Sequence, residues 1–351
     1  MRRPLNVSIV GCGAVAIDRH ISAFKKIREV NIVTLVDHDL ARVKKVASFS
    51  SVSRVYHSLS EMLQEEKLDL VDICTPPQTH AQLIMQAMDK GCHVLVEKPM
   101  AMTTKECKEI LHSQKGSGVK LGVIHNWLFQ PPLLKVRSIV DKGSLGDIIG
   151  ARIEVLSPPW DIMAANEKHW VHKLPGGRFG EMLIHPIYLL QHFLGGALKV
   201  ENVSTCKLGN YNWMPYDELH VTLRSVKGLG SIYASFNSPR ENVTMSIYGR
   251  ETVLRVELIT GTILVLGRSH YGFPNYDKSA IGIDVLRQAS HLLTSATKNA
   301  SKAIFGKYPT GHETYIRLFV NSLINEKEPP VTTQDAYEAV RVLEEVCTLT
   351  S

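Results

Sequence analysis

The sequence predicts an α/β protein in which a doubly wound parallel sheet is followed by an α+β domain with a large open, mainly antiparallel sheet. Two observations predict this class. Early in the chain, strand-like runs alternate with helical segments, which indicates a parallel sheet. Later, strand-like runs follow one another across short turns, which indicates antiparallel pairing. Because 351 residues exceed the size at which one core stops growing, roughly 250–300 residues, two domains are expected, over residues 1–122 and 123–351.

The composition is typical of a globular protein, with 44% hydrophobic and 21% charged residues. The net charge of +6 is spread along the chain, so it gives little support for a nucleic-acid partner. The six cysteines form no Cys-x-x-Cys pair, which predicts reduced thiols and a cytoplasmic protein. The N-terminal apolar run is too short for a signal peptide, and no run of about 18 apolar residues could span a membrane.

The first domain is expected to alternate strands and helices. The expected strands span residues 6–10, 31–36, 68–74, 93–96 and 120–124. The expected helices span residues 17–28 and 103–114, and another begins near His80. Thr103 or Thr104 is the N-cap candidate of the 103–114 helix, with Glu106 placed to complete a capping box.

The first strand ends in Gly11-Cys12-Gly13-Ala14-Val15-Ala16, which opens the first helix. Gly11 permits a tight turn, Gly13 lets the backbone approach a pyrophosphate, and Ala16 allows close packing of helix and strand. Free N–H groups at the start of a helix attract phosphate. Since an acid, Asp37, closes the next strand, the pattern predicts a dinucleotide-binding (Rossmann) site. The alternative is a glycine turn that binds nothing.

Asp37 and Arg42 bear on the choice of cofactor. A carboxylate at this position accepts hydrogen bonds from the adenosine ribose and repels a 2′-phosphate, which favours NAD. Arg42 could instead bind that phosphate, so NADP stays open. A solvated helix arginine is the alternative interpretation of Arg42.

Three strand ends are expected to face one crevice: Gly11, Thr75-Pro76 and Glu97-Lys98. Pro99 ends the last of these strands because it has no N–H to donate. Lys98 is therefore expected where a strand leaves its sheet, directed at a ligand. An ordinary surface lysine is the alternative.

The second domain is expected to begin with a helix at residues 131–142. Its expected strands span residues 148–156, 200–207, 218–224, 230–236, 243–249, 252–257 and 262–266. A sheet this large with few covering helices favours self-association, so a homo-oligomer (dimer or tetramer) is expected through it. The amphipathic segment 283–305 is expected to pack on the domain, and the alternative is an interfacial helix for a membrane or a lipid-linked substrate.

Within this domain, Glu181 and His185 are four residues apart, so a helix would present both on one face. Pro186 disfavours helical dihedrals at His185 and would clash with the carbonyl of Met182 inside a helix. Either the helix is kinked here or a helix begins near Pro186.

The glycine turn, Thr75-Pro76, Glu97-Lys98-Pro99 and Gly176-Gly177…Glu181…His185, in this order, resemble the glucose–fructose oxidoreductase / inositol dehydrogenase (Gfo/Idh/MocA) family over nearly the whole chain. The resemblance implies a Rossmann domain, a C-terminal sheet used for oligomerisation, and NAD(P)-dependent oxidation or reduction of a sugar, cyclitol or nucleotide-sugar carbon. The family's lysine matches Lys98, and its acid followed by histidine matches Glu181 and His185. That acid is commonly aspartate, so Glu181 is a departure.

The expected site residues form three groups. The catalytic group is Lys98, His185 and Glu181. The cofactor-binding group is Gly11, Cys12, Gly13, Ala14, Val15, Asp37, Arg42, Thr75, Pro76, His80, Glu97, Lys98 and Asn126, the last resembling a family asparagine. The substrate group is Lys98, Asn126, Trp127, Arg178, Glu181 and His185, with loops at residues 160–170 and 271–276. No histidine spacing suggests a metal triad, so no metal is expected.

A histidine, with an unperturbed pKa of about 6.5, suits general acid/base catalysis, so His185 is assigned that role. Lys98 would stabilise negative charge on the reacting oxygen, and Glu181 would orient the histidine or bind a neighbouring hydroxyl. The expected partner is a small sugar-like substrate. A redox-cycling lyase or glycosidase is one alternative, and a non-catalytic dinucleotide-binding regulator is another. The regulator predicts loss of the lysine or the histidine, and both are present.

Overall fold

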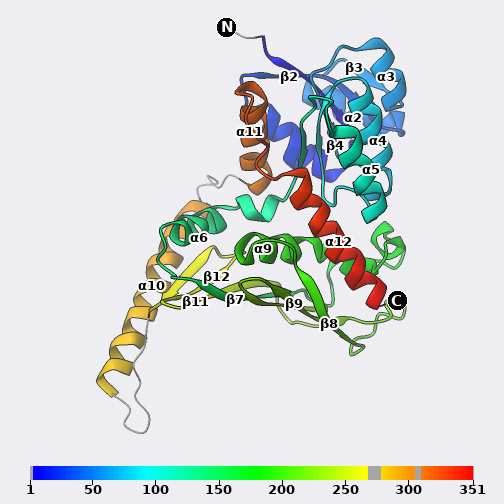
Figure 1. The fold of residues 1–351 in the computed structure, drawn as a ribbon. Coiled ribbons are helices and arrows are strands. Elements are labelled where there is room, and N and C mark those ends of the chain that lie inside the picture. Colours follow the sequence, from blue (N-terminus) through cyan, green and yellow to red (C-terminus); the bar gives the residue numbers. More distant parts are fainter. Residues whose placement is uncertain (1–2, 268–277, 305–309, 351) are drawn as a thin grey trace. The chain divides into compact units, whose positions relative to one another are not determined.

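The computed structural model describes residues 3–267, 278–304 and 310–350, and the chain divides into two compact units. The first unit holds residues 1–129 and 310–344, and the second holds residues 130–309 and 345–351. This division differs from the expected one at residues 122 and 123. Helix α11 (Gly311–Ile324), late in the sequence, packs on α1 (Ser22–Phe24) and η3 (Asn126–Phe129), so it belongs to the first unit (Figure 1).

The first unit is built on a six-stranded sheet in the order β3-β2-β1-β4-β5-β6, with every pair parallel. The strands are β1 (Leu5–Val10), β2 (Val30–Val36), β3 (Arg54–Tyr56), β4 (Leu70–Ile73), β5 (His93–Val96) and β6 (Leu121–Val123). The strand order reverses between β1 and β4, and ligands bind outside the carboxyl ends of the strands at such a reversal. The expected parallel, doubly wound sheet is confirmed.

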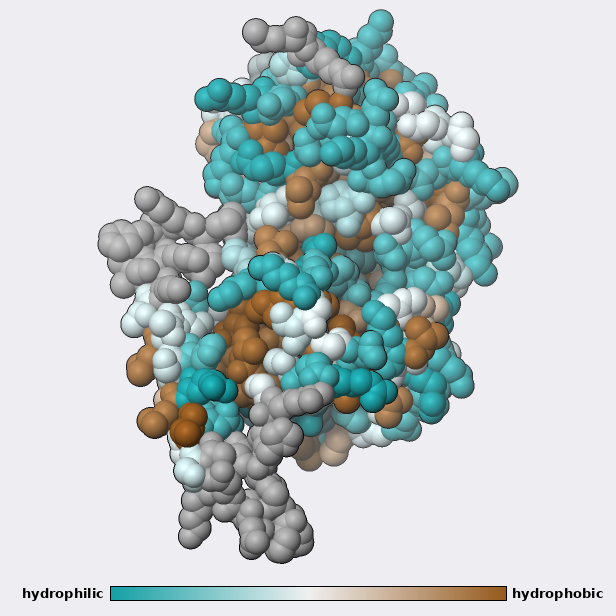
Figure 2. Space-filling model, turned by 60° about the vertical axis from the view of Figure 1, so that its left-hand side comes forward, coloured by the Kyte–Doolittle hydropathy of each residue, from teal (hydrophilic) through white to brown (hydrophobic). Residues whose placement is uncertain are grey.

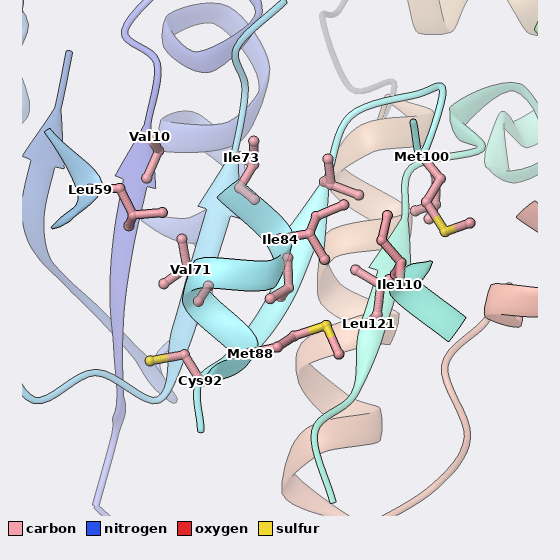
Figure 3. Packing of buried hydrophobic residues seen from close by; sticks show 14 of the residues in the cluster. Val10, Leu59, Val71, Ile73, Ile84, Met88, Cys92, Met100, Ile110 and Leu121 are labelled. Atoms are coloured by element: carbon pink, nitrogen blue, oxygen red, sulfur yellow. The ribbon is translucent and has the colours of Figure 1, made fainter. Parts of the chain in front are cut away.

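Helices cover one face of this sheet through a continuous apolar core (Figure 3). The helices on this side are α3 (Leu59–Glu65), α4 (His80–Asp89), α5 (Thr104–Gln114) and the first part of α12 (Thr333–Leu349). The central strands contribute Val71, Ile73, Val94 and Val96 to this core. Met100 and Ala101, which follow Pro99, are also buried in it, so the chain beyond β5 is anchored in the core.

The opposite face of the same sheet meets α11. Side chains alternate along a strand, so Asp72 and Leu95 point away from the core of Figure 3. On this side a Cβ added at Gly122 would lie 2.6 Å from Phe319 of α11 and 3.2 Å from the Leu95 side chain. Gly122 therefore lets α11 approach the sheet closely, and Asp72 lies on a face that a helix covers.

The helices of the first unit agree in part with those expected from the sequence. Of the two N-cap candidates, Thr103 is the one that caps α5, and it forms a capping box with Glu106. The expected helix over residues 17–28 is instead a π-helical turn, η1 (Ala16–Ile21), followed by α1, which ends at Phe24. Residues 25–27 close into tighter turns that bury Ile27, so the helix stops before β2. The sequence did not locate α2 (Leu40–Ser50) and η2 (Pro77–Thr79), nor did it locate α3, η3 and α11.

The second unit is built on a seven-stranded sheet in the order β13-β12-β11-β7-β10-β9-β8. The strands are β7 (Ile148–Leu156), β8 (Lys199–Cys206), β9 (Glu218–Ser225), β10 (Gly228–Ser235), β11 (Asn242–Gly249), β12 (Val253–Glu257) and β13 (Thr262–Leu266). All pairs are antiparallel except β7 with β10, which is parallel. The expected open, mainly antiparallel sheet is confirmed.

Helices lie on one face and along one edge of this second sheet (Figure 1). The helices are α6 (Pro131–Asp141), α7 (Ile162–Ala165), η4 (Trp170–Lys173), α8 (Gly177–Met182), α9 (Ile184–Leu194) and α10 (Lys278–Ile304). Of these, α9 packs on β7 and β10 and is almost wholly buried. It begins two residues before Pro186, which agrees with a helix starting near that proline.

Helix α10 packs along β13, as the packed alternative for residues 283–305 expects. Asn299 donates a hydrogen bond from Nδ2 to the Thr260 carbonyl at 2.9 Å. Ile283, Leu286 and Leu293 remain exposed, and Figure 2 shows apolar surface gathered on the side of the second unit where α10 lies. Phe305 and the loop at 271–276 lie outside the described residues. Among the described residues, no helix is both long and apolar enough to cross a membrane.

Candidate active site

The glycine turn lies directly after β1, where the strand order of the first sheet reverses. Gly11 has φ +92°, and a Cβ on it would lie 2.9 Å from the carbonyl of Cys74 and from the Thr75 side chain. A Cβ on Gly13 would meet nothing within 4 Å. Gly11 is therefore required by the neighbouring strand end, whereas the space beside Gly13 is open and leaves its backbone accessible to a ligand.

Cys12, Ala14 and Val15 complete the turn. The backbone N–H of Cys12 donates to Asp37 Oδ2 at 2.8 Å, which ties the turn to the end of β2. The Cys12 side chain is fully buried, and burial raises the pKa of its thiol to about 12. Ala14 is exposed and Val15 is half-buried at the start of the helical segment. The turn therefore presents backbone rather than reactive side chains.

Asp37 and Arg42 lie together at the carboxyl end of β2. Asp37 Oδ1 accepts a hydrogen bond from the backbone N–H of Asp39 at 2.9 Å. Arg42 Nη1 is 3.4 Å from both carboxylate oxygens of Asp37, and Arg42 Nη2 is 3.3 Å from Asp39 Oδ2. The Arg42 side chain is 45% exposed. Arg42 is therefore an ion-pair partner of Asp37 that keeps solvent-facing surface.

Glu97 and Lys98 follow β5 directly. Glu97 is buried, and its Oε1 is 2.9 Å from His20 Nε2 and 3.2 Å from His312 Nε2. Its Oε2 accepts the backbone N–H of Lys98 at 3.2 Å. Lys98 is half-buried and Pro99 is buried. Glu97, predicted as a cofactor contact, is thus held by two histidines and by the backbone of the next residue.

Thr75, Pro76 and His80 form the neighbouring strand end, after β4. The Thr75 and Thr79 hydroxyls are 2.7 Å apart, and Pro76 is exposed. His80 is fully buried, with Nδ1 2.8 Å from the Pro99 carbonyl and Nε2 2.9 Å from the Thr75 carbonyl. His80 therefore braces two strand ends through backbone contacts. Burial lowers the pKa of its ring, although the two carbonyl oxygens that face the ring nitrogens favour the protonated form.

Asn126 and Trp127 open η3, directly after β6, and both are half-buried. They lie at the carboxyl end of a strand in the same sheet as Gly11, Thr75 and Lys98. The first unit thus brings its predicted site residues to one edge of its sheet. That edge is the ligand-binding edge of doubly wound folds.

In the second unit, Glu181 and Arg178 lie on α8 and pair with each other. Arg178 Nη1 contacts Glu181 Oε2, and Arg178 Nε donates to Asp161 Oδ1 at 3.2 Å. The guanidinium also lies 5.4 Å from the centre of the Phe236 ring. Only 11% of the Arg178 side chain is exposed. Burial disfavours the Asp161 carboxylate, yet the hydrogen bond from Arg178 holds the pKa of Asp161 below its usual value.

His185 lies on α9, in the turn after Glu181. It is buried, and its Nδ1 is 2.8 Å from the hydroxyl of Tyr188, which is itself buried. Leu183, between the two helices, keeps helical dihedrals (φ −63°, ψ −22°), so Glu181 and His185 are one turn apart on nearly continuous backbone. Pro186 has no N–H to donate to the Met182 carbonyl, so one helical hydrogen bond is missing where α8 passes into α9.

A cavity of about 220 Å³ lies beside the start of α8 within the second unit. Its lining includes Arg178, Gly177, His172, Trp213 and Tyr216. Arg178, a predicted substrate contact, therefore faces a cavity while its charge is balanced by Asp161 and Glu181.

Sequence reasoning missed His20, Asp72, Asp161, Tyr188 and His312. His20 Nδ1 is 2.8 Å from Asp72 Oδ2, and both side chains are fully buried. One signal was present in the sequence: Asp72 interrupts an apolar strand, and a buried acid needs a partner. The partner itself, 52 positions away, could not be found from local pattern.

Two groups of possible metal ligands occur among the described residues: His20 with Glu97 and His312, and His20 with Asp72 and Cys74. Both ring nitrogens of His20 already face carboxylates, so the members of each group are paired with one another. The expectation that the protein holds no metal stays a prediction.

Comparison with known families agrees with this arrangement. Residues 5–125 match the oxidoreductase family with an NAD-binding Rossmann fold, Gfo/Idh/MocA, and residues 133–255 match the C-terminal domain of the same family. The protein therefore belongs to the Gfo/Idh/MocA family of NAD(P)-dependent oxidoreductases. The family and cofactor expected from the sequence are confirmed.

Individual relatives are distant. Oxidoreductase P35 of Formosa agariphila is 26% identical over 76% of this chain and 83% of its own length. D-glucoside 3-dehydrogenase of Escherichia coli is 28% identical over 55% of this chain and 54% of its own length. The structure of the WlbA dehydrogenase from Bordetella pertussis, in complex with NADH and UDP-GlcNAcA, is similar with a TM-score of 0.79 and 20% identity, over 100% of this chain and 97% of that one. At this identity the structural match establishes the fold.

Proposed function

We propose that this protein transfers a hydride between NAD and a secondary alcohol or ketone carbon of a sugar, cyclitol or nucleotide sugar. The observation that carries the proposal is the open glycine turn at the reversal point of the first sheet, with Asp37 at the end of the next strand. The names of the relatives support the substrate class, since D-glucoside, D-apiose and D-xylose dehydrogenases are among them.

The residues of the glycine turn fit a dinucleotide. The open space beside Gly13 leaves the start of the helical segment accessible to phosphate oxygens, and Asp37 would hold the adenosine ribose. Bound NAD supplies the hydride acceptor or donor. Because Arg42 lies beside Asp37 and is 45% exposed, it could also pair with a 2′-phosphate, so NADP is retained as a second cofactor.

Lys98 is proposed to hydrogen-bond the reacting substrate oxygen and to stabilise the negative charge that develops there. An ammonium group that is already fixed in place costs little reorganisation during the reaction. The Glu97 carboxylate holds the backbone of Lys98, and Pro99 and Met100 are buried behind it. Lys98 therefore projects from an anchored segment.

His185 is proposed as the general acid/base. The contact between its Nδ1 and the Tyr188 hydroxyl, at 2.8 Å, fixes the orientation of the imidazole ring, and an imidazole suits proton exchange with substrate near neutral pH. Glu181 is committed to Arg178, so we propose that this pair contacts substrate hydroxyls. The longer side chain of glutamate, relative to aspartate, lets it reach the guanidinium from one turn away.

The test uses the full-length protein with Lys98→Met and His185→Ala variants, and with Lys108→Met and His112→Ala as controls at exposed positions of α5. We would measure NADH formation with nucleotide sugars and simple polyols, and NAD binding by calorimetry. Both site variants should lose turnover while binding NAD, and both controls should behave as wild type. Full activity in either site variant contradicts its role. Sugar turnover without net NADH would contradict simple oxidation.

We further propose that the protein is a homo-oligomer, joined through the second sheet, and that it works in the cytoplasm. The open face of that sheet supports the first point. Light scattering on the purified protein tests it, since a monomeric mass at micromolar concentration would exclude the oligomer.

A further inference from the structure

A network of four ionisable side chains lies in the first unit, with contacts in the order Asp72, His20, Glu97 and His312. The contacts are Asp72 Oδ2 to His20 Nδ1 at 2.8 Å, His20 Nε2 to Glu97 Oε1 at 2.9 Å, and Glu97 Oε1 to His312 Nε2 at 3.2 Å. The side chains of His20 and Asp72 are 0% exposed, and those of Glu97 and His312 are 10% and 13% exposed. Four such groups are costly to bury unless they are paired.

Strand register explains why this network of side chains forms. Asp72 of β4 pairs with Leu95 of β5, and the backbone N–H of Glu97 donates to the Ile73 carbonyl at 3.0 Å. Because side chains alternate along a strand, Asp72, Leu95 and Glu97 project on the same face, away from the core of Figure 3. His20 from the π-helical turn reaches both acids on that face, and His312 comes from the first turn of α11.

The protons on the His20 ring follow from the carboxylates of Asp72 and Glu97 that face its two nitrogens. An ionised carboxylate only accepts hydrogen bonds, so a His20 ring that bonds two carboxylates carries a proton on each nitrogen. Burial disfavours this charge, yet Asp72 raises the pKa of His20 well above its usual value. Burial also disfavours the Glu97 carboxylate, yet the hydrogen bonds from His20 and His312 hold the pKa of Glu97 well below its usual value. Both shifts favour the charged forms of His20 and Glu97.

This network of side chains contacts the backbone of Lys98. Glu97 Oε1 receives two histidine donors, while Glu97 Oε2 receives the N–H of Lys98 at 3.2 Å. The carboxylate is thus held from both sides, and it fixes the peptide that carries Lys98. His80, from the neighbouring strand end after β4, contacts the Pro99 carbonyl through its Nδ1 at 2.8 Å.

We propose that His20 and His312 are positioning residues, which act through Glu97 to fix the orientation of Lys98. This inference rests on the proposed role of Lys98 in hydride transfer. Neither histidine needs to touch cofactor or substrate, so their loss should alter the chemical step more than binding. The other ionisable groups near Glu97 and His20 are Cys74, His80 and Lys98, and on α11 the next residue, Glu313, is paired with Lys26 at 2.7 Å.

His312 is the better residue to change, because loss of the fully buried His20 would leave Asp72 without its charged partner. His312→Ala removes the donor to Glu97, and His312→Gln offers an amide N–H in its place. His112→Ala, at an exposed position of α5, is the matched control. Urea unfolding and circular dichroism would establish that each variant is folded.

Two readouts test the proposal. The first is acylation of Lys98 by a limiting amount of an activated ester, followed by peptide mass spectrometry across pH, with Lys108 as the internal reference. In His312→Ala the labelling rate of Lys98 should change about tenfold, because the peptide that carries its side chain is no longer fixed, with the labelling rate of Lys108 unchanged. The second is steady-state kinetics, in which kcat should fall about tenfold while KM for NAD is unchanged. His312→Gln should recover most of both effects.

A folded His312→Ala variant with wild-type labelling of Lys98 and wild-type kcat overturns the proposal. A loss that His312→Gln fails to recover, or that His112→Ala reproduces, also overturns it, because the effect would then not pass through the donor to Glu97. If wild type turns over no sugar or polyol, the proposed function fails. The labelling result still decides whether His312 positions Lys98.

Discussion

Gly11 and Gly13 lie two residues apart, and substitution of each by alanine should have opposite consequences. At Gly11 the backbone has φ +92° and a Cβ would lie 2.9 Å from the carbonyl carbon and oxygen of Cys74. At Gly13 the same Cβ would meet nothing within 4 Å, and φ lies outside the left-handed region. Gly11→Ala should therefore damage the folded protein, whereas Gly13→Ala should affect only a ligand that approaches the backbone.

The expected size of each effect follows from this geometry. A left-handed conformation costs a non-glycine residue about 1–2 kcal/mol. Overlap with backbone atoms that cannot rotate away adds about 1–3 kcal/mol. Gly11→Ala should thus lower the free energy of unfolding by about 2–5 kcal/mol, a large part of the ~5–15 kcal/mol typical of a domain. Gly13→Ala should change it by about 0.5 kcal/mol or less.

NAD binding should reverse the ranking of the two variants. If the dinucleotide approaches Gly13 closely, a methyl group there should raise the Kd for NAD about tenfold, or ~1.4 kcal/mol. Urea unfolding without NAD and calorimetric titration with NAD measure the two effects separately. Tight NAD binding by Gly13→Ala would refute the role given to this glycine. Wild-type stability in Gly11→Ala would refute the steric argument.

Three other substitutions test the charges and hydrogen bonds around the site. Arg178→Met should lower the free energy of unfolding by about 2–3 kcal/mol, because Asp161 loses its cation. Since the pKa of Asp161 is lowered in the fold, wild type should lose the stability that this ion pair contributes as pH falls below about 4. An Arg178→Met variant with an unchanged urea midpoint at pH 7 would contradict the pairing. Tyr188→Phe should reduce kcat about tenfold and shift its pH profile by freeing Nδ1 of His185; an unchanged profile argues against this contact. Arg42→Ala should weaken NADP binding about tenfold more than NAD binding, and equal losses in paired titrations would exclude Arg42 from 2′-phosphate recognition.

Much of the fold was predictable because its signals are local. The strand at residues 148–156 was expected with its observed bounds, since apolar positions and turn residues define it without help from the rest of the chain. Thr103 and Glu106 likewise indicate the start of α5, because both lie within the same four residues of sequence. The helix over residues 17–28 was wrong in its extent, because the π-helical turn and early stop depend on β2 and on packing that no window of sequence displays.

The residues of the candidate site likewise divide into those with a local signal in the sequence and those without one. Gly11, Gly13 and Asp37 could be identified because the turn, the helix start and the next strand end are consecutive elements. Arg178 was expected as a substrate contact, and the structure adds that its side chain, only 11% exposed, pairs with Asp161 and Glu181. Its partner Asp161 is 17 positions away across a loop, so periodicity could not connect them.

Buried charge offers a route to such long-range pairs. An acid inside an apolar strand, as Asp72 is between Val71 and Ile73, must meet a donor because an unpaired buried carboxylate is too costly. Parallel neighbouring strands with period-two alternation then restrict where the donor can bind: the face shared by Asp72 and Glu97. A histidine on the helix that follows β1 can satisfy both acids at once, since it has two ring nitrogens. His20 meets this requirement, so the arrangement behind Lys98 follows from strand register and the cost of burying charge.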